Sequence, residues 1–170
     1  QESRAVWSPD GSRIVFNGGT TVTSAMDLFT KASNGAGSEQ VILKDSMNKT
    51  PFSWSHSGKF LMYSAGRPTD INLWVLPLAG DAKPIPYMQT TYGEAWGRFS
   101  PDDECVAFGS NESGRAEIYV APFPATGEKV RVSTTGAAAG VANIGARWRA
   151  DGRELFYVSS DRAMMSAEIA

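Results

Sequence analysis

The stretch WSPDGSRIVF, residues Trp7–Phe16, decides the fold. A tryptophan leads into a Pro-Asp-Gly turn, in which proline presets φ and glycine accepts a positive φ. After the turn the chain alternates, with Ile14 and Phe16 on one side and Val15 on the other, as in a β-strand. The stretch therefore predicts two antiparallel strands joined by a tight turn.

The same unit occurs four times along the 170 residues. The copies are AVWSPDGSRIVF from Ala5, FSWSHSGKFLMY from Phe52, GRFSPDDECVAF from Gly97 and ARWRADGRELFY from Ala146. They recur at intervals of roughly 45 to 49 residues, the period of a four-stranded propeller blade. Each copy has one aromatic anchor before its turn: Trp7, Trp54, Phe99 and Trp148.

We therefore expect an all-β fold of four-stranded antiparallel propeller blades. The blades are predicted at about 1–44, 45–89, 90–134 and 135–170, and the last one lacks a fourth strand. In this interpretation Trp96 lies in a connection between blades, outside the repeated pattern.

The composition restricts the class of partner. The formal net charge is −2 and the pI is about 5.4, so nucleic acid is not an expected partner. No apolar run approaches the ~18 residues that a membrane helix needs. Cys105 is the only cysteine, which excludes an internal disulfide and a cysteine-based zinc cluster. The chain begins at Gln1 without a signal-peptide pattern, so we expect a processed or excised piece of a longer protein.

The motif W-S-P-D-G-x-x-I-x-F resembles the repeat of TolB-like propellers. So does a third strand that opens with Asp, Asn or Glu, then Leu or Ile, then an aromatic residue. The longer text, such as LWVLPLAGDAKP and RFSPDDECVAFGSNESGRAEIYVAPFP, is similar to the C-terminal propeller of certain bacterial membrane-anchored serine/threonine kinases. This resemblance implies an extracytoplasmic sensor or interaction domain, periplasmic or extracellular. The chain has no kinase signature.

The chain departs from this family in its turns and in its length. His56 and Ser57 replace the Pro-Asp of the turn in the second copy, and Asp103 replaces the turn glycine in the third. TolB-like propellers usually close with six or more blades, whereas this chain has somewhat under four. An open array would expose apolar faces carrying Trp7 and Phe156. We therefore expect a homo-oligomer, with a dimer favoured, in which two chains pair head to tail to close a ring. A strained four-blade ring and an artificial fragment are the alternatives.

The repeated motif is interpreted as structural. Asp10, Asp102 and Asp151 recur at one turn position, where they could bind a cation but more simply cap their own turns. The aromatic anchors are expected to pack between blades rather than to stack on sugars. His56 is expected to be a surface turn residue and Cys105 a small core residue. With no G-x-S-x-G motif, we expect no catalytic residue, metal ligand or cofactor.

One group of residues suggests a ligand site at a mouth of the propeller, where connections between blades gather. It comprises Trp96, Tyr92, Glu94, Lys49 and Asn143, with Asn48 beside them. An indole, a phenol and a carboxylate together would suit a peptide or a glycan, whereas local loop packing is the alternative.

The sequence thus favours a non-catalytic interaction module that binds a protein, peptide or glycan. An accessory propeller domain of a hydrolase or lyase is the alternative. A free-standing assembly unit, whose one evident property is self-association, is the third hypothesis.

Overall fold

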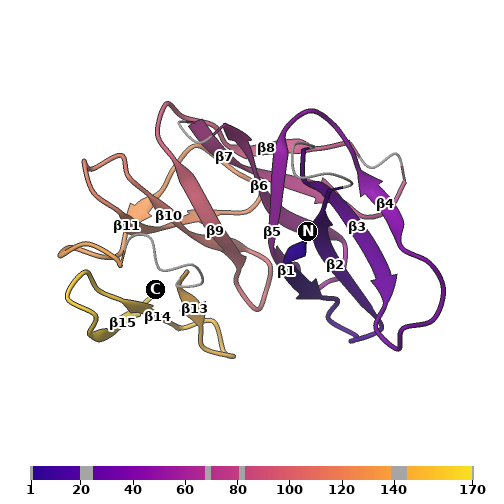
Figure 1. The fold of residues 1–170 in the computed structure, drawn as a ribbon. Coiled ribbons are helices and arrows are strands. Elements are labelled where there is room, and N and C mark those ends of the chain that lie inside the picture. The colour runs from indigo at the N-terminus through magenta and orange to yellow at the C-terminus, as the bar shows by residue number, and fades with distance from the viewer. Residues whose placement is uncertain (1, 20–24, 68–69, 81–82, 139–144, 170) are drawn as a thin grey trace.

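The computed structural model describes residues 2–19, 25–67, 70–80, 83–138 and 145–169. They form four antiparallel sheets that succeed one another in chain order, from indigo to yellow in Figure 1. Every strand in a sheet pairs with its neighbour in sequence. Such up-and-down sheets are the blades of a propeller, and we number them blades 1 to 4.

Fifteen strands make up the blades in this part of the chain. Blade 1 contains β1 (Glu2–Trp7), β2 (Arg13–Gly18), β3 (Asp27–Ala32) and β4 (Gln40–Leu43). Blade 2 contains β5 (Asn48–Trp54), β6 (Phe60–Arg67), β7 (Asp70–Pro77) and β8 (Ile85–Met88). Blade 3 contains β9 (Glu94–Phe99), β10 (Cys105–Ser110), β11 (Glu117–Pro122) and β12 (Val130–Arg131). Blade 4 contains β13 (Arg147–Trp148), β14 (Glu154–Val158) and β15 (Met164–Glu168), with no fourth strand among the described residues.

The first two strands of every blade are joined by the repeated turn. One residue of each turn has a left-handed backbone: Gly11 (φ 69°), Gly58 (φ 74°), Asp103 (φ 62°) and Gly152 (φ 74°). Glycine adopts this conformation at little cost, and aspartate tolerates it better than most residues. The replacement at Asp103 therefore keeps the turn geometry, as predicted.

The turns set the same register in all four blades. Each aromatic anchor pairs across the ladder with an apolar residue of the next strand: Trp7 with Ile14, Trp54 with Leu61, Phe99 with Val106 and Trp148 with Leu155. Directly opposed residues share a face of the sheet. These pairs define the leading face of each blade, which is the face directed toward the preceding blade.

The core lies between the blades. Leu61 of blade 2 belongs to one cluster with Val15 of blade 1, and Trp54 packs against that cluster. The other two clusters repeat this arrangement: Phe99 and Val106 with Met62, and Leu155 with Ala107 beside Trp148. Val15, Met62 and Ala107 thus define the trailing face, which is directed toward the following blade. The alternation predicted for Ile14 and Val15 is confirmed.

The innermost strands of blades 2 and 3 begin earlier than the sequence indicated. Strand β5 starts at Asn48, and strand β9 starts at Glu94, where Glu94 and Ala95 pair with Ser110 and Gly109. Trp96 therefore lies within a strand, which corrects its assignment to a connection. A register shift opposite residues 107–109 interrupts the ladder there, and the alternating pattern is lost with it.

None of the residues that the structure describes belongs to a helix long and apolar enough to cross a membrane.

Candidate functional site

The repeated aspartates bind their own turns. Asp10 Oδ1 accepts hydrogen bonds from Ser8 Oγ (2.6 Å) and from the backbone N–H of Ser12 (3.0 Å). These bonds, first that from Ser8, lower the pKa of Asp10 to about 2. Asp102 and Asp151 are held in the same way by groups of their own turns. Among the described residues, no group of three or more His, Cys, Asp or Glu side chains is placed to hold a metal.

The aromatic anchors pack between blades, except for the first. Trp54, Phe99 and Trp148 each contact the cluster shared with the preceding blade. Trp148 also donates a hydrogen bond from its indole N–H to the carbonyl oxygen of Arg98 in blade 3 (3.1 Å). Trp7 is covered by no preceding blade among the described residues, and 60% of its surface is exposed.

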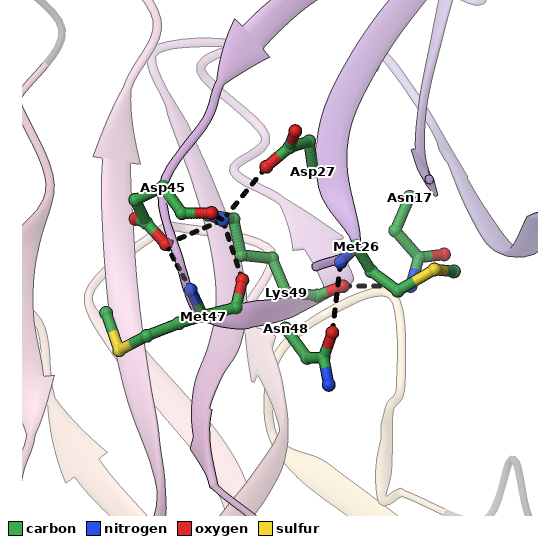
Figure 2. Close-up of polar contacts among 7 residues, drawn as sticks. All are labelled: Asn17, Met26, Asp27, Asp45, Met47, Asn48 and Lys49. Carbon is green, nitrogen blue, oxygen red and sulfur yellow. Dashed lines mark hydrogen bonds and ion pairs between the residues drawn. The ribbon is translucent and has the colours of Figure 1, made fainter. Parts of the chain in front are cut away.

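Lys49 has a fully buried side chain, and Figure 2 shows its ammonium group between Asp27 and Asp45. Its ammonium group lies 3.3 Å from Asp27 Oδ1 and 2.7 Å from Asp45 Oδ1. It also donates hydrogen bonds to the carbonyl oxygens of Asp45 (3.4 Å) and Met47 (2.8 Å). The structure therefore gives this cation an internal role, and it presents no charge at a mouth of the propeller.

The backbone at Lys49 joins blade 2 to blade 1. Its N–H donates to the carbonyl oxygen of Met26 (3.0 Å), and its carbonyl oxygen accepts from Asn17 Nδ2 (2.8 Å). Asn48 Oδ1 accepts from the N–H of Met26 (3.0 Å), also drawn in Figure 2. These bonds fix the start of β5 against the preceding blade.

Three blades repeat the device seen at Lys49. A polar residue at or near the start of the third strand, at one position of the repeat, bonds the chain entering the next blade. Asp27 holds Lys49, Asn72 Oδ1 accepts from the N–H of Thr90 (3.1 Å), and Glu117 Oε2 accepts from Ser133 Oγ and from the N–H of Gly136 (3.1 Å). We call these three contacts the blade latches. The Asp/Asn/Glu at this point of the repeat was the sequence signal for them, but its structural role was missed.

The segment from Thr90 to Glu94 shows how the predicted mouth residues lie. The Glu94 side chain is fully buried, and its Oε1 accepts a hydrogen bond from Thr90 Oγ1. Its Oε2 is buried without a hydrogen-bond partner among the described residues, and burial raises the pKa of this carboxyl group. Tyr92 is 45% exposed, so of these three residues the tyrosine presents the largest surface to a ligand.

Trp96 is held in a strained backbone conformation by its packing. Its φ is 62°, which is uncommon for a bulky residue. The indole lies directly on Gly109, because a Cβ there would come within 2.7 Å of Trp96 Cε3. A Cβ on Gly145 would lie 2.8 Å from Trp96 Cβ. Packing against these two glycines accounts for the half-buried position of Trp96. Contact between Trp96 and a ligand stays a prediction.

The remaining residues are placed as follows. His56 is exposed in its turn, as predicted. Cys105 is partly buried against a core cluster, and burial raises the pKa of its thiol. Asn143 lies outside the described residues.

No protein-family profile matches the chain, and no curated protein matches it. Solved structures do. A protein reported as TolB from Agrobacterium tumefaciens superposes with a TM-score of 0.75 at 16% identity, over 91% of this chain and 53% of that one. TolB from Acinetobacter baumannii gives a TM-score of 0.71 at 20% identity, over 98% of this chain and 40% of that one. The fold is that of a TolB-like β-propeller.

The TolB-like propeller fold also occurs in enzymes. An oligogalacturonate lyase in complex with manganese gives a TM-score of 0.73 at 12% identity, over 100% of this chain and 49% of the lyase. A puromycin-hydrolyzing peptidase from Mycobacterium tuberculosis gives 0.73 at 16% identity, over 93% of this chain and 28% of the peptidase. The chain thus spans about half or less of these proteins, and the likeness concerns the fold alone.

Proposed function

We propose that this chain is a non-catalytic scaffold and interaction module whose two open end faces pair with those of a second copy to close the ring. The observation that carries the proposal is the exposure of Trp7. Its three counterparts pack against the preceding blade, whereas 60% of its own surface faces solvent. At this point of the repeat an aromatic anchor is normally covered by a neighbouring blade, so the exposure of Trp7 marks an uncovered blade face.

The partner positions on the leading face follow the same pattern. Leu61, Val106 and Leu155 are 0% exposed, whereas the equivalent Ile14 in blade 1 is only partly buried. Blade 1 therefore has a face of the interior type without a blade to cover it. This exposure also argues against the strained four-blade ring, in which blade 4 would cover Ile14.

The trailing face of blade 4 is the second open end, complementary to the open leading face of blade 1. Val15, Met62 and Ala107 are at most 1% exposed, whereas the equivalent Phe156 in blade 4 is only partly buried. A second copy supplies a leading face to each open trailing face, in the register already used three times within the chain. Such a head-to-tail contact between identical chains closes into a ring.

The ligand in this proposal is a protein, a peptide or a glycan, bound at the mouth near Tyr92 and Trp96. Lys49 and Glu94 would support this surface from within, because both side chains are fully buried. We place the module in the periplasm or outside the cell, where the fold similarity to TolB supports such a location.

Thermal unfolding at several protein concentrations tests the proposal. A ring completed between chains gains stability with concentration, so the Tm should rise over the micromolar range. Trp7→Ser should remove this dependence, whereas Tyr92→Ser, a change at an exposed aromatic residue elsewhere, should keep it. A wild-type Tm that does not change with concentration would contradict the proposal.

A further inference from the structure

The side chains of three arginines on innermost strands have no role in the blade contacts described above. Arg4 lies on β1, Arg98 on β9 and Arg147 on β13, so they come from blades 1, 3 and 4. Arg98 and Arg147 occupy the same position of the repeat, directly before the anchors Phe99 and Trp148. The innermost strands of a propeller line its central channel.

The three cations act on one another electrostatically. Burial, followed by the charges of Arg147 and Arg4, lowers the pKa of Arg98 to about 10. Burial and then Arg147 lower the pKa of Arg4, and burial lowers that of Arg147. Like charges on three separate blades therefore approach closely enough to repel.

No carboxylate compensates these charges in the part of the chain that the structure describes. Its ion pairs involve other cations, such as Lys49, Arg115 and Arg149. Arg98 Nε is buried without a hydrogen-bond partner among those residues. A buried donor without an acceptor costs free energy, and an anion would remove both this cost and the repulsion.

Two of these arginines, Arg4 and Arg98, border a cavity. A cavity of about 550 Å³ is lined by Arg4 and Arg98 together with Trp7, Phe52 and Trp54, from strands β1, β5 and β9. The Arg4 guanidinium lies 5.3 Å from the centre of the Phe52 ring. The cavity thus offers cationic donors beside aromatic surface.

We propose that Arg4 and Arg98 form a binding site for the oxyanion of a small ligand, a carboxylate or a phosphate, at the innermost strands. Guanidinium groups bind both anions through paired N–H···O bonds. The aromatic walls then contact the apolar part of the ligand. The site stands apart from the mouth around Tyr92.

Isothermal titration calorimetry on the purified chain tests this site with two probes, inorganic phosphate and tricarballylate, at constant ionic strength. At least one probe should bind saturably, and the tighter one identifies the preferred oxyanion. Arg98→Gln should raise the Kd at least ~10-fold, because one of the two guanidinium groups of the site is lost. Arg131→Gln, which removes an exposed arginine on β12, should leave the Kd unchanged.

Circular dichroism and the oligomeric mass of each variant establish that it is folded and assembled as the wild type. Should Arg98→Gln fail this check, Arg4→Gln replaces it, because Arg4 approaches the cavity from another blade. Absence of saturable binding of both probes, or an unchanged Kd in the folded arginine variants, would overturn the proposal. Neither result bears on whether the chain forms a dimer, so failure here is separable from failure of the proposed function.

Discussion

Aspartate has two different roles in the repeated turns. Asp10 accepts hydrogen bonds from its own turn, in the position that aspartate favours locally. Asp103 sits one residue further along, in place of glycine, and reaches the neighbouring blade. Its two carboxylate oxygens accept from the N–H groups of His56 (2.7 Å) and Ser57 (2.8 Å). The departure of the third copy from the repeat is therefore a contact between blades 2 and 3.

The aspartates that accept hydrogen bonds within their own turns should make the fold less stable at acid pH. The pKa of Asp10 falls from 3.8 to about 2 in the folded chain, and that of Asp151 does the same. A depressed carboxyl pKa stabilises the fold above pH 3.8, and this contribution is lost as the pH falls toward 2. Urea unfolding of the wild type between pH 5 and pH 2 should therefore show a declining free energy of unfolding.

Asp10→Asn should lessen that decline, because asparagine keeps an acceptor for the Ser12 N–H but does not titrate. Glu128→Gln, at an exposed carboxylate outside the repeated turns, is the matched control and should keep the wild-type decline. Equal declines in the wild type and Asp10→Asn would show that the turn carboxylate does not carry the effect.

The sequence predicts such local roles well and burial across blades poorly. The turn function of Asp10 depends on residues within five positions, all visible in the motif. Lys49 and Glu94 have charged side chains that usually face solvent, and the ion pair that joins Lys49 to the preceding blade is made with Asp27, which lies outside the local motif. Nothing in the local pattern shows this partner.

At the level of elements, the blade latches explain how four separate sheets keep their order. Blades 1 to 3 each begin their third strand near the segment that enters the next blade, and a polar residue at that point bonds the entering segment. The chemistry differs each time: an ion pair at Asp27, an amide at Asn72 and a carboxylate at Glu117. The three latches therefore occupy the same position of the repeat, although the groups that they bond differ.

The latch at Lys49 should contribute strongly to stability. Lys49→Met would leave the Asp27 carboxylate, which is 9% exposed, without its cation, and such a loss typically costs about 3–5 kcal/mol. Lys31→Met, which breaks the exposed Lys31–Glu39 pair at 3.8 Å, should cost less than about 1 kcal/mol. Chemical denaturation measures both values. Similar losses in the two variants would mean that the buried pair is not a latch.

The arginine site is the part that sequence reasoning missed. Arg4 and Arg98 lie far apart in sequence, and they come together only at the cavity that strands of blades 1 and 3 both line. A net charge of −2 gave no indication of a local cationic cluster. The signal that could have suggested it is the arginine directly before the anchor in both Arg98-Phe99 and Arg147-Trp148.

At the scale of the whole molecule, the number of blades determines whether one chain can complete the ring. Fold class and blade order follow from a pattern that recurs four times in register, so the sequence predicts them. Completion of the ring does not follow from any single repeat. It is suggested by Trp7, Ile14 and Phe156, which occupy interior positions of the repeat yet remain exposed or half-exposed. Burying the exposed 60% of Trp7 removes roughly 90–150 Å² from water, about 2–4 kcal/mol at ~25 cal/mol per Å².

The mass of the chain in solution tests the central claim most directly. Size-exclusion chromatography with light scattering on the wild type at micromolar concentration should give the mass of two chains, and Trp7→Ser should give the mass of one. A well-behaved wild-type monomer under these conditions would contradict the account, because the open faces of blades 1 and 4 would then be stable in water without a second copy.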